Sequence, residues 1–327
     1  MAVIAIDLGG TKLASAICNS RGKLSHKSVV PLDGRKGCEV GGLIQQQIVS
    51  LREIAASDQI KIQSVGICVP GIAWQKTGRV WAPNIPGWEN YPLRKEISAA
   101  LKNKSIAVKI DSDRACYILG ETWLGAARGC KDAIFLAVGT GIGAGILIDG
   151  KILRGANDIA GAIGWMALDR PFETKYKSCG CFEFHASGEG LARVAKEFLA
   201  AEGKGAWTAR SRESQHAIRA DGPSALRSAR EIFSADETGD LVAKKTLHQA
   251  VEFWGMAVAN LISLFNPEKI IFGGGVFGPA KKFLPQIFSE AKKWAQPISI
   301  QQVKLEASKL GGDAGLYGAA YLALRKE

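Results

Sequence analysis

Residues 3–18, VIAIDLGGTKLASAIC, place a β-branched run, a glycine-rich turn and a second apolar run in immediate succession. This succession is typical of a β-hairpin. It returns at residues 132–149, where DAIFLAV is followed by GTGIG and AGILID, and GKIL then begins a third strand. The internal repeat predicts two lobes of similar build.

Strands and helices alternate along the rest of the chain. Further buried strands are expected in SVGICV at 64–69, SIAVKIDSD at 105–113 and KIIFGGGV at 269–276. Apolar residues recur at helical spacing over residues 41–56. We expect further helices from Arg114 onward, over polar sequence between about 191 and 250, over VEFWGMAVANLISLF at 251–265, and over the small-residue segment that ends the chain. The alternation favours an α/β fold.

The composition excludes several classes of protein. The chain has 327 residues, of which 47% are hydrophobic and 22% charged, as in ordinary globular proteins. No apolar run approaches the ~20 residues of a membrane span, and no charged segment precedes the first apolar stretch as in a secretory signal. Seven scattered cysteines fit a reducing compartment, so we expect a cytoplasmic protein without a membrane partner. Glycine is in excess, at 38 residues, and must serve tight turns or close approach to a ligand.

The first glycine loop runs from Asp7 to Lys12. Its backbone N–H groups could wrap phosphate oxygens, while Thr11 adds a hydroxyl and Lys12 a positive charge. Asp7, at the end of the strand, could hold Mg²⁺ directly or through water. A simple hairpin turn explains the same residues equally well.

Three further glycine loops follow in the sequence. A strand rather than a helix follows Gly139-Thr140-Gly141, so a dinucleotide-binding fold is rejected there. Gly273-Gly274-Gly275 and Gly311-Gly312 lie at strand ends beside helix starts, where a flat base could approach the backbone. Each loop alone fits ordinary turn chemistry. Two phosphate-type hairpins, one in each half, fit a nucleotide clamped between two lobes.

Asp111-Ser112-Asp113 stands where a strand gives way to a helix. A carboxylate at this position could accept a proton from a substrate hydroxyl. It could also cap the helix, a role for which Asp and Ser are preferred. The residues leave both roles open and favour the cap.

Taken in order, these motifs resemble the ROK family (repressor, open reading frame, kinase), whose enzymes are sugar kinases of the two-lobed actin-like ATPase, or ribonuclease H-like, fold. The resemblance covers nearly the whole chain. Its motifs are DLGGTK from Asp7, VPG from Val69, PNIPGW from Pro83, SDRACYILGE from Ser112, the stretch 139–165, GCFEFHASG from Gly180, FGGGV from Phe272 and GGDAGLYGAA from Gly311.

The resemblance implies an ATP- and Mg²⁺-dependent kinase that phosphorylates a hydroxyl of a sugar or sugar-like polyol, with Asp113 as the general base. It implies that the nucleotide is held by Gly9, Gly10, Thr11, Lys12, Gly139, Thr140, Gly141, Gly273, Gly274, Gly275 and Gly312, with Asp7 beside Mg²⁺. The implied substrate side comprises Gly71, Asn84, Ser112, Asp113, Trp165 and Glu183.

The resemblance also implies a domain organisation and an assembly. One lobe should cover residues 1–112, with the C-terminal helix at about 313–327 returning to it, and the other lobe should cover residues 113–312. Family members are commonly dimers or tetramers, so we expect a homodimer.

The departures from the family pattern lie on the substrate side. Ser112 stands where the family has Asn, Ala162 where it has a sugar-binding glutamate, and Trp165 where it has a histidine that touches sugar and binds zinc. Cys179 and Cys181 alone remain of the zinc stretch; His185 lies close, but a fourth ligand is missing, so we expect no structural zinc. A fully hydroxylated hexose would lose hydrogen-bond partners at such a site. We therefore predict an altered acceptor, which is a modified or amino sugar or a cyclitol.

Two other classes of protein fit the sequence less well. ROK-type repressors carry a helix-turn-helix domain ahead of the kinase-like part, whereas this chain enters its phosphate loop at Asp7, and Asp113 argues against a non-catalytic sugar sensor. The net charge of +11 could indicate nucleic-acid binding. Acidic residues are interleaved in the most basic stretch and no nucleic-acid motif is present, so we expect no nucleic-acid partner. That stretch contains Arg210, Arg212, Arg219, Arg227 and Arg230.

Overall fold

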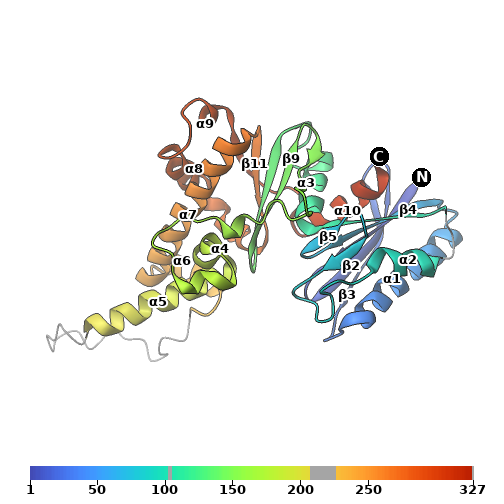
Figure 1. Ribbon diagram of the computed structural model, residues 1–327, viewed down its shortest axis with the longest axis horizontal. Helices are drawn as coiled ribbons and strands as arrows, with labels where there is room; N and C mark the ends of the chain where they lie inside the picture. Colours follow the sequence, from blue (N-terminus) through green and yellow to red (C-terminus); the bar gives the residue numbers. More distant parts are fainter. Residues whose placement is uncertain (102–104, 207–225, 326–327) are drawn as a thin grey trace. The chain divides into compact units, whose positions relative to one another are not determined.

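The computed structural model describes residues 1–101, 105–206 and 226–325 (Figure 1). Three arginines of the basic stretch therefore lie outside the described residues, namely Arg210, Arg212 and Arg219. The chain divides into two compact units. The first comprises Met1–Phe135, Gly145–Gly161 and Ser308–Glu327, and the second comprises Leu136–Ala144 and Ala162–Ala307.

A five-stranded sheet forms the centre of the first unit, in the order β3-β2-β1-β4-β7. Its strands are β1 (Ala2–Leu8), β2 (Lys12–Asn19), β3 (Leu24–Pro31), β4 (Ile62–Val69) and β7 (Ala107–Ser112). The first three form an antiparallel meander, while β4 runs parallel to β1 and β7 parallel to β4. The unit also contains a small hairpin and four helices: β5 (Ile72–Trp74), β6 (Arg79–Trp81), α1 (Gly37–Ser57), α2 (Leu93–Leu101), α3 (Asp113–Leu124) and α10 (Ala314–Leu324).

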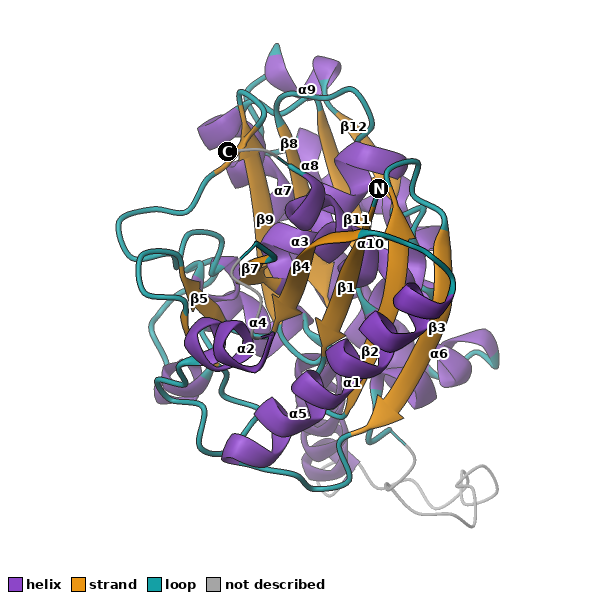
Figure 2. Ribbon diagram, turned by 90° about the vertical axis from the view of Figure 1, so that its right-hand side faces the viewer, coloured by secondary structure: helices purple, strands orange, loops and turns teal. Residues whose placement is uncertain are grey.

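The central strands β1, β2 and β4 are buried on both faces, which explains why they are apolar at most positions. Alternate residues of β1, from Ala2 to Leu8, join one core beneath α1 and α2. Val3 and Ala5 belong to a second core with α10 and with Cys116 of α3. Figure 2 shows α1 and α2 on the near face of the sheet.

The second core is closed by glycines that let backbones touch. A Cβ at Gly318 of α10 would overlap the carbonyl oxygen of Cys116, and a Cβ at Gly66 of β4 would overlap that of Ala319. At Gly120 of α3 a Cβ would lie 2.9 Å from the carbonyl oxygen of Ala314. The small residues of the final segment thus serve the close packing of α10 against α3 and β4.

A second five-stranded sheet has the order β10-β9-β8-β11-β12. Its strands are β8 (Ala133–Val138), β9 (Ile142–Ile148), β10 (Lys151–Ile152), β11 (Lys269–Gly273) and β12 (Lys304–Ala307). As in the first sheet, three consecutive strands are followed by two that come later in the chain, which confirms the internal repeat. β8 and β9 each pass from one compact unit into the other.

Helices make up most of the second unit, around the 25-residue α7 (Leu241–Phe265). The others are α4 (Cys181–Ala186), α5 (Gly188–Ala206), α6 (Ala229–Glu237), α8 (Leu284–Lys292) and α9 (Ser299–Gln302). Single 3₁₀ turns cover Ile163–Trp165, Thr174–Ser178, Gly275–Phe277 and Pro279–Phe283, and another precedes α10 at Gly311–Asp313. Fourteen residues of α7 are buried, because the five other described helices of this unit pack around it.

The predicted strands and most of the predicted helices are confirmed with shifts of a few residues at their ends. The helix predicted at 251–265 is the second part of α7, which begins at Leu241, and the stretch predicted between about 191 and 250 contains α5, α6 and the start of α7, while residues 207–225 lie outside the described residues. The helix predicted at 41–56 begins earlier, at Gly37, and the helix predicted from Arg114 begins at Asp113. β3, β12 and the β5-β6 hairpin were not predicted, because they are short or carry few apolar residues. The predicted lobe boundary after Ser112 stays a prediction. The compact units place α3 with residues 1–112, since α3 packs against α10.

None of the seven cysteines, all of which are described residues, forms a disulfide, and most are buried. Cys18, Cys68, Cys116, Cys179 and Cys181 are buried, Cys130 is partly buried and Cys38 is exposed. Burial raises the pKa of the Cys68 and Cys116 thiols. Among the helices of the described ranges, none is both long and apolar enough to cross a membrane.

The packing of α10 predicts an opposite response at two helical glycines. Gly318→Ala should destabilise the first unit by about 1–3 kcal/mol, because the methyl group overlaps the backbone of α3. Gly42→Ala is the matched control: this glycine of α1 has open space around it, so alanine should stabilise by about 0.5–1 kcal/mol through helix propensity. Urea unfolding of both variants tests the prediction, and an unchanged midpoint for Gly318→Ala would contradict it.

Candidate active site

Acidic residues meet at the carboxyl edge of the parallel part of the first sheet. Asp7 of β1 pairs with Cys68 of β4, and Cys68 pairs with Asp111 of β7. The carboxyl ends of neighbouring parallel strands are where open α/β sheets bind their ligands. The register thus brings Asp7 and the Asp111-Ser112-Asp113 segment to one edge of one unit.

Asp111 is fully engaged in structural contacts. Its side chain is 2% exposed, and its two oxygens accept from Nη1 and Nη2 of Arg154 at 2.8 and 2.7 Å. Oδ1 also accepts from the Ser112 N–H at 2.9 Å. A buried carboxylate needs such a charge-assisted pair to offset its desolvation. Asp111 is therefore committed to holding Arg154 and the end of β7.

Ser112 caps α3, which leaves Asp113 free of that role. The Ser112 hydroxyl accepts from the Ala115 N–H at 3.3 Å, as the helix-cap interpretation predicted. Asp113 accepts from the Arg114 N–H at 2.8 Å, and it forms no ion pair within 4.0 Å with any residue that the structure describes. The cap and the reactive carboxylate are thus two different residues of one motif.

The pKa of Asp113 is raised to about 6, chiefly because burial penalises the carboxylate. The charge of Asp7 raises it further, while Arg114 lowers it through its own charge and its backbone N–H. A carboxyl group with this pKa is largely ionised at pH 7 and still basic enough to take a proton during a reaction.

Asp7 points to the face of the sheet that α10 covers, as do Val3 and Ala5. Its carboxylate occupies the space left by Gly315 in the first turn of α10, where a Cβ would overlap it. Burial raises the pKa of Asp7, and the charge of Asp313 adds to this effect, whereas Lys12 lowers it.

The first glycine loop is an exposed hairpin turn in which the Gly9 N–H donates to the Lys12 carbonyl at 2.9 Å. A Cβ at Gly10 would touch the Asn84 side chain at 3.4 Å, so Asn84 lies directly against the loop. Gly312 has open space around it. Lys27 of β3 forms an ion pair at 2.6 Å with Asp313, the residue after Gly312.

Arg114 links Gly71 to Asp113, because it interacts with both residues. The Arg114 guanidinium donates to the Gly71 carbonyl at 3.3 Å, and it is also the charge that lowers the pKa of Asp113. Gly71 has a φ of +88°, and a Cβ there would overlap the carbonyl oxygen of Trp81, so glycine is required. Of the predicted substrate residues, Gly71, Ser112 and Asp113 therefore form one cluster.

The second glycine loop lies in the second unit, against the start of α5. The Gly139 N–H donates to the Gly141 carbonyl at 2.9 Å, and the Gly139 carbonyl accepts from the Gly188 N–H at 2.7 Å. Gly274 has a φ of +90°, and a Cβ there would overlap the Val138 carbonyl oxygen. Gly273 ends β11, and no described residue beyond its chain neighbours lies within 4 Å of a Cβ at Gly275. The structure thus brings two predicted nucleotide loops together.

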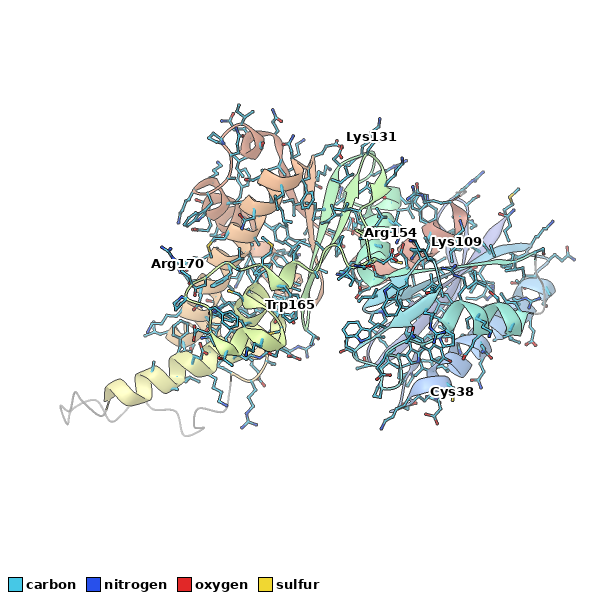
Figure 3. The ribbon with its side chains drawn as sticks, viewed as in Figure 1. Cys38, Lys109, Lys131, Arg154, Trp165 and Arg170 are labelled. Atoms are coloured by element: carbon cyan, nitrogen blue, oxygen red, sulfur yellow. The ribbon has the colours of Figure 1, made fainter. Side chains whose placement is uncertain are left out.

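Glu183 of α4 is held by the second glycine loop. Its Oε2 accepts from the Ile142 N–H at 2.6 Å, and a Cβ at Gly141 would lie 2.6 Å from the same oxygen. Burial raises its pKa, while the Ile142 N–H and Arg193 lower it. Trp165, predicted on the same substrate side, is an exposed residue, with 59% of its surface accessible. Figure 3 marks its place.

The residues left from the zinc stretch do not fit a zinc ion. His185 uses both ring nitrogens, Nε2 towards the Tyr176 hydroxyl and Nδ1 towards the Gln249 amide, each at 3.0 Å, and it stacks on Phe253. Cys179 receives a hydrogen bond from Arg193 at 3.4 Å. Within the described residues no group of three or more potential ligands forms. Aromatic packing and hydrogen bonds hold this segment.

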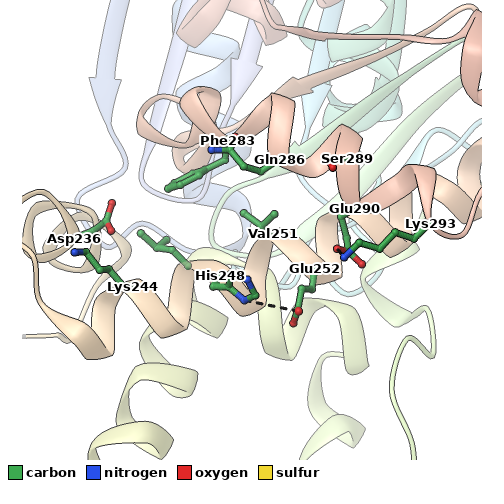
Figure 4. Close-up of a pocket in the computed structure, with 11 residues that line it drawn as sticks. Asp236, Lys244, His248, Val251, Glu252, Phe283, Gln286, Ser289, Glu290 and Lys293 are labelled. Atoms are coloured by element: carbon green, nitrogen blue, oxygen red, sulfur yellow. Dashed lines mark hydrogen bonds and ion pairs between the residues drawn. The ribbon is translucent and has the colours of Figure 1, made fainter.

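A groove in the second unit contains none of the predicted site residues. It lies between α6, α7 and α8, with an apolar floor that includes Val251 and Phe283 (Figure 4). On its rim His248 and Glu252 lie 3.8 Å apart. The groove and the predicted site residues are separate features of this unit.

Four residues that position the site were not found by sequence reasoning. They are Arg154, Arg114, Gly315 and Gly188, which contact Asp111, Gly71, Asp7 and Gly139 respectively. A buried aspartate signals that a cation must be near, but only the fold identifies Arg154. Gly315 lies in the small-residue motif of the final helix, where a glycine that makes room for a distant carboxylate looks like any other.

Comparison with known proteins gives this arrangement a context. A family model described as "ROK family" matches residues 3–326. A glucokinase of Halalkalibacterium halodurans is 31% identical over 331 residues, which cover 99% of this chain and 95% of that protein. A xylose repressor of Caldicellulosiruptor bescii is 32% identical over 261 residues, which cover 79% of this chain and 61% of the repressor.

A solved structure is similar over the same length. The ROK family glucokinase of Streptomyces griseus, crystallised with glucose and AMPPNP, has a TM-score of 0.73 at 27% identity and covers 98% of this chain and 99% of its own. This likeness confirms the predicted α/β, two-lobed actin-like ATPase fold. Because the family model spans nearly every residue, from 3 to 326, the chain belongs to the ROK family.

Proposed function

We propose that this protein is an ATP-dependent kinase that phosphorylates a hydroxyl of a sugar or sugar-like polyol, with Asp113 as the general base. The observation that carries the proposal is the difference between the two aspartates at the end of β7. Asp111 is neutralised by Arg154, whereas Asp113 has no ion pair among the described residues and a pKa of about 6. The similarity to glucokinases supports the substrate class. A homodimer in the cytoplasm stays a prediction of the sequence.

In this reaction Asp113 carries out a single proton transfer. Its carboxylate accepts the proton of the acceptor hydroxyl while that oxygen forms a bond to the γ-phosphorus of ATP, and the bond to the β–γ bridging oxygen breaks to release ADP. Phosphoryl transfer of this kind depends mainly on positioning and on neutralising charge. Arg114 supports the positioning, since it contacts the Gly71 carbonyl and lies close enough to Asp113 to lower its pKa.

The phosphates of ATP would be held by backbone N–H groups of the glycine loops. In the first unit these belong to Gly10 and Thr11, with the positive charge of Lys12 beside them, while Gly9 closes the turn through its own N–H. In the second unit they belong to Thr140 and Gly141, since the Gly139 N–H closes the turn and the Gly139 carbonyl is held by the start of α5. Loops of this kind bind anions because successive N–H groups converge on one point.

Asp7 fits the role of a Mg²⁺ residue. Its carboxylate has room beside Gly315 because glycine has no side chain. The charge of Lys12 lowers the pKa of Asp7 and the charge of Asp313 raises it. Kinases hold Mg²⁺ with one or two carboxylates together with substrate phosphates, so a cluster of three protein ligands is not required. Bound there, the ion would neutralise negative charge on the phosphates.

The acceptor, we infer, is a modified or amino sugar or a cyclitol rather than a plain hexose. Ala162 and Trp165 replace the glutamate and histidine of the family pattern. The exposed indole of Trp165 offers apolar surface and one N–H donor where the histidine would offer an ionisable ring. Glu183 and Asn84 remain as polar groups for the acceptor.

Replacing the base should abolish phosphoryl transfer without unfolding the protein. Asp113→Asn should lower kcat by about 10²–10⁴-fold with little change in KM for ATP, because the amide cannot accept the proton. ADP release measured over hexoses, amino sugars, deoxy sugars and cyclitols tests this. The variant should be at least as stable as the parent at pH 7.5, since burial of a charge is relieved.

Asp149→Asn is the matched control for this variant, because it makes the same change at an exposed turn residue. Its activity should equal that of the parent. If Asp113→Asn retained full kcat, the assignment of the base would be wrong. If the parent bound sugars but released no ADP with any acceptor, the protein would be a sugar sensor instead, a possibility that the similarity to a xylose repressor raises.

The pKa of Asp113 sets the acid limb of the pH profile. Only the ionised carboxylate accepts a proton, so kcat/KM should be level above about pH 7 and fall about tenfold per pH unit below the pKa of about 6. The raised pKa also makes ionised Asp113 unfavourable for folding, so its cost is absent below the unfolded pKa and grows as pH rises through 6. A profile that stayed level down to pH 4.5 would contradict this assignment.

Restoring the family's polar residues should restore glucose as an acceptor. The double variant Ala162→Glu/Trp165→His should raise kcat/KM for glucose by about tenfold or more, because a hydroxyl that lost its partner regains one. Trp165→Phe is the control, since it changes the side chain without adding a polar partner. If the parent itself used glucose with a kcat/KM of ~10⁶ M⁻¹s⁻¹ or higher, an altered acceptor would be excluded.

A further inference from the structure

A hollow of the first unit lies at the end of α10 that is remote from Asp7. It is lined by Lys109 of β7, Leu119 of α3, the 151–154 segment, and Leu322 and Arg325 at the end of α10. Ten residues separate Gly315, beside Asp7, from Arg325, which amounts to ~15 Å of helix. The hollow and the catalytic edge are therefore distinct places in one unit.

Positive charge dominates the lining of this hollow. Of the seven described residues that line it, four are cationic, three are apolar and none is acidic: Lys109, Lys151, Arg154, Arg325, Leu119, Ile152 and Leu322. Arg154 is paired with Asp111, whereas the other three cations have no carboxylate within 4.0 Å in the described part of the chain. Uncompensated like charges repel one another, so such a cluster is favourable chiefly when an anion lies among them.

Hydrogen bonds to backbone carbonyls hold the cationic groups in place. Lys109 Nζ donates to the carbonyl of Arg325, and Arg325 Nη2 donates to the Gly150 carbonyl at 3.3 Å. A lysine has three N–H donors and an arginine five, so donors remain for a ligand. Figure 3 shows Lys109 and Arg154 close together. The apolar walls lower the local dielectric and strengthen attraction to an anion.

We propose that this pocket binds a small phosphate-bearing anion, either inorganic phosphate or a phosphate monoester. Converging arginine and lysine side chains, of which only Arg154 is paired with a carboxylate among the described residues, suit the several acceptor oxygens and the double charge of a phosphate group. The cavity volume is about 240 Å³. Pockets for drug-sized ligands hold ~300–1,000 Å³, so the size favours a compact ligand.

The pocket is linked to the catalytic edge through Arg154. The same guanidinium that lines the pocket pairs with Asp111, two residues before Asp113. An anion that attracts Arg154 weakens its hold on Asp111 and loosens the end of β7 that positions Asp113. Arg154 is here a positioning residue, and phosphate in the pocket should lower kcat. This consequence, unlike the binding itself, rests on the proposed function.

Direct binding to the full-length protein, without ATP or acceptor, tests the pocket. Calorimetry with inorganic phosphate and, separately, with glucose 6-phosphate should show one saturable site at constant ionic strength. Lys109→Gln and Lys151→Gln should each weaken binding about tenfold, the value of one charge-assisted hydrogen bond. Lys23→Gln removes an equal charge at an exposed residue outside the pocket and should leave the affinity unchanged.

The binding results distinguish inorganic phosphate from a phosphate monoester as the ligand, and they test binding separately from inhibition. Binding of both probes indicates that the phosphate group alone is recognised, and binding of glucose 6-phosphate alone indicates a monoester site. No saturable binding of either probe, or equal binding by the parent and both pocket variants, would overturn the proposal.

Inhibition supplies an independent readout. Phosphate should lower kcat without changing KM for ATP in the parent, and Lys151→Gln should relieve the inhibition while its uninhibited kcat stays that of the parent. Inhibition that is competitive with ATP and unchanged in Lys151→Gln would overturn the link through Arg154. A protein without kinase activity would still be subject to the binding test.

Discussion

The ion pair between Asp111 and Arg154 is the interaction on which the catalytic edge depends. A carboxylate that is 2% exposed cannot stay charged without a cation, and the arginine offers it two parallel N–H donors. The pair fixes the end of β7, from which the next residue caps α3 and the one after it presents a free carboxylate. The position of the paired Asp111 thus determines the position of Asp113, which has no ion pair among the described residues.

The two glycine loops differ in the span of the hydrogen bond that closes them and in the residues that support them. Each is closed by a hydrogen bond between its own first N–H and a carbonyl within the turn. The first loop rests on the Asn84 side chain, and the second rests on the start of α5 and on Glu183. Similar local sequences therefore yield turns closed in different ways, and the elements that support each loop come from unrelated parts of the chain.

The local structure was largely predictable from the sequence, because apolar runs, paired glycines and helix starts act over a few residues. The strand–turn–strand repeat and the capping by Ser112 are of this kind. The contacts that tune the site were not predictable. These contacts join residues that are far apart in the chain, namely Asp111 with Arg154 and Asp7 with Gly315. The sequence around each aspartate does not indicate which distant residue it contacts. The expected roles of the substrate-side residues rest on the family resemblance, and experiment must decide them.

The distribution of thiols gives the protein a built-in attachment point. Cys38, in the first turn of α1, is the exposed one of seven cysteines (Figure 3). Its neighbour Gly37 donates to the Pro86 carbonyl at 2.8 Å and accepts from the Trp88 indole at 2.9 Å. A maleimide dye attached to Cys38 would therefore sit beside the segment that carries Asn84, and its fluorescence would report a ligand arriving at that segment without any engineered mutation.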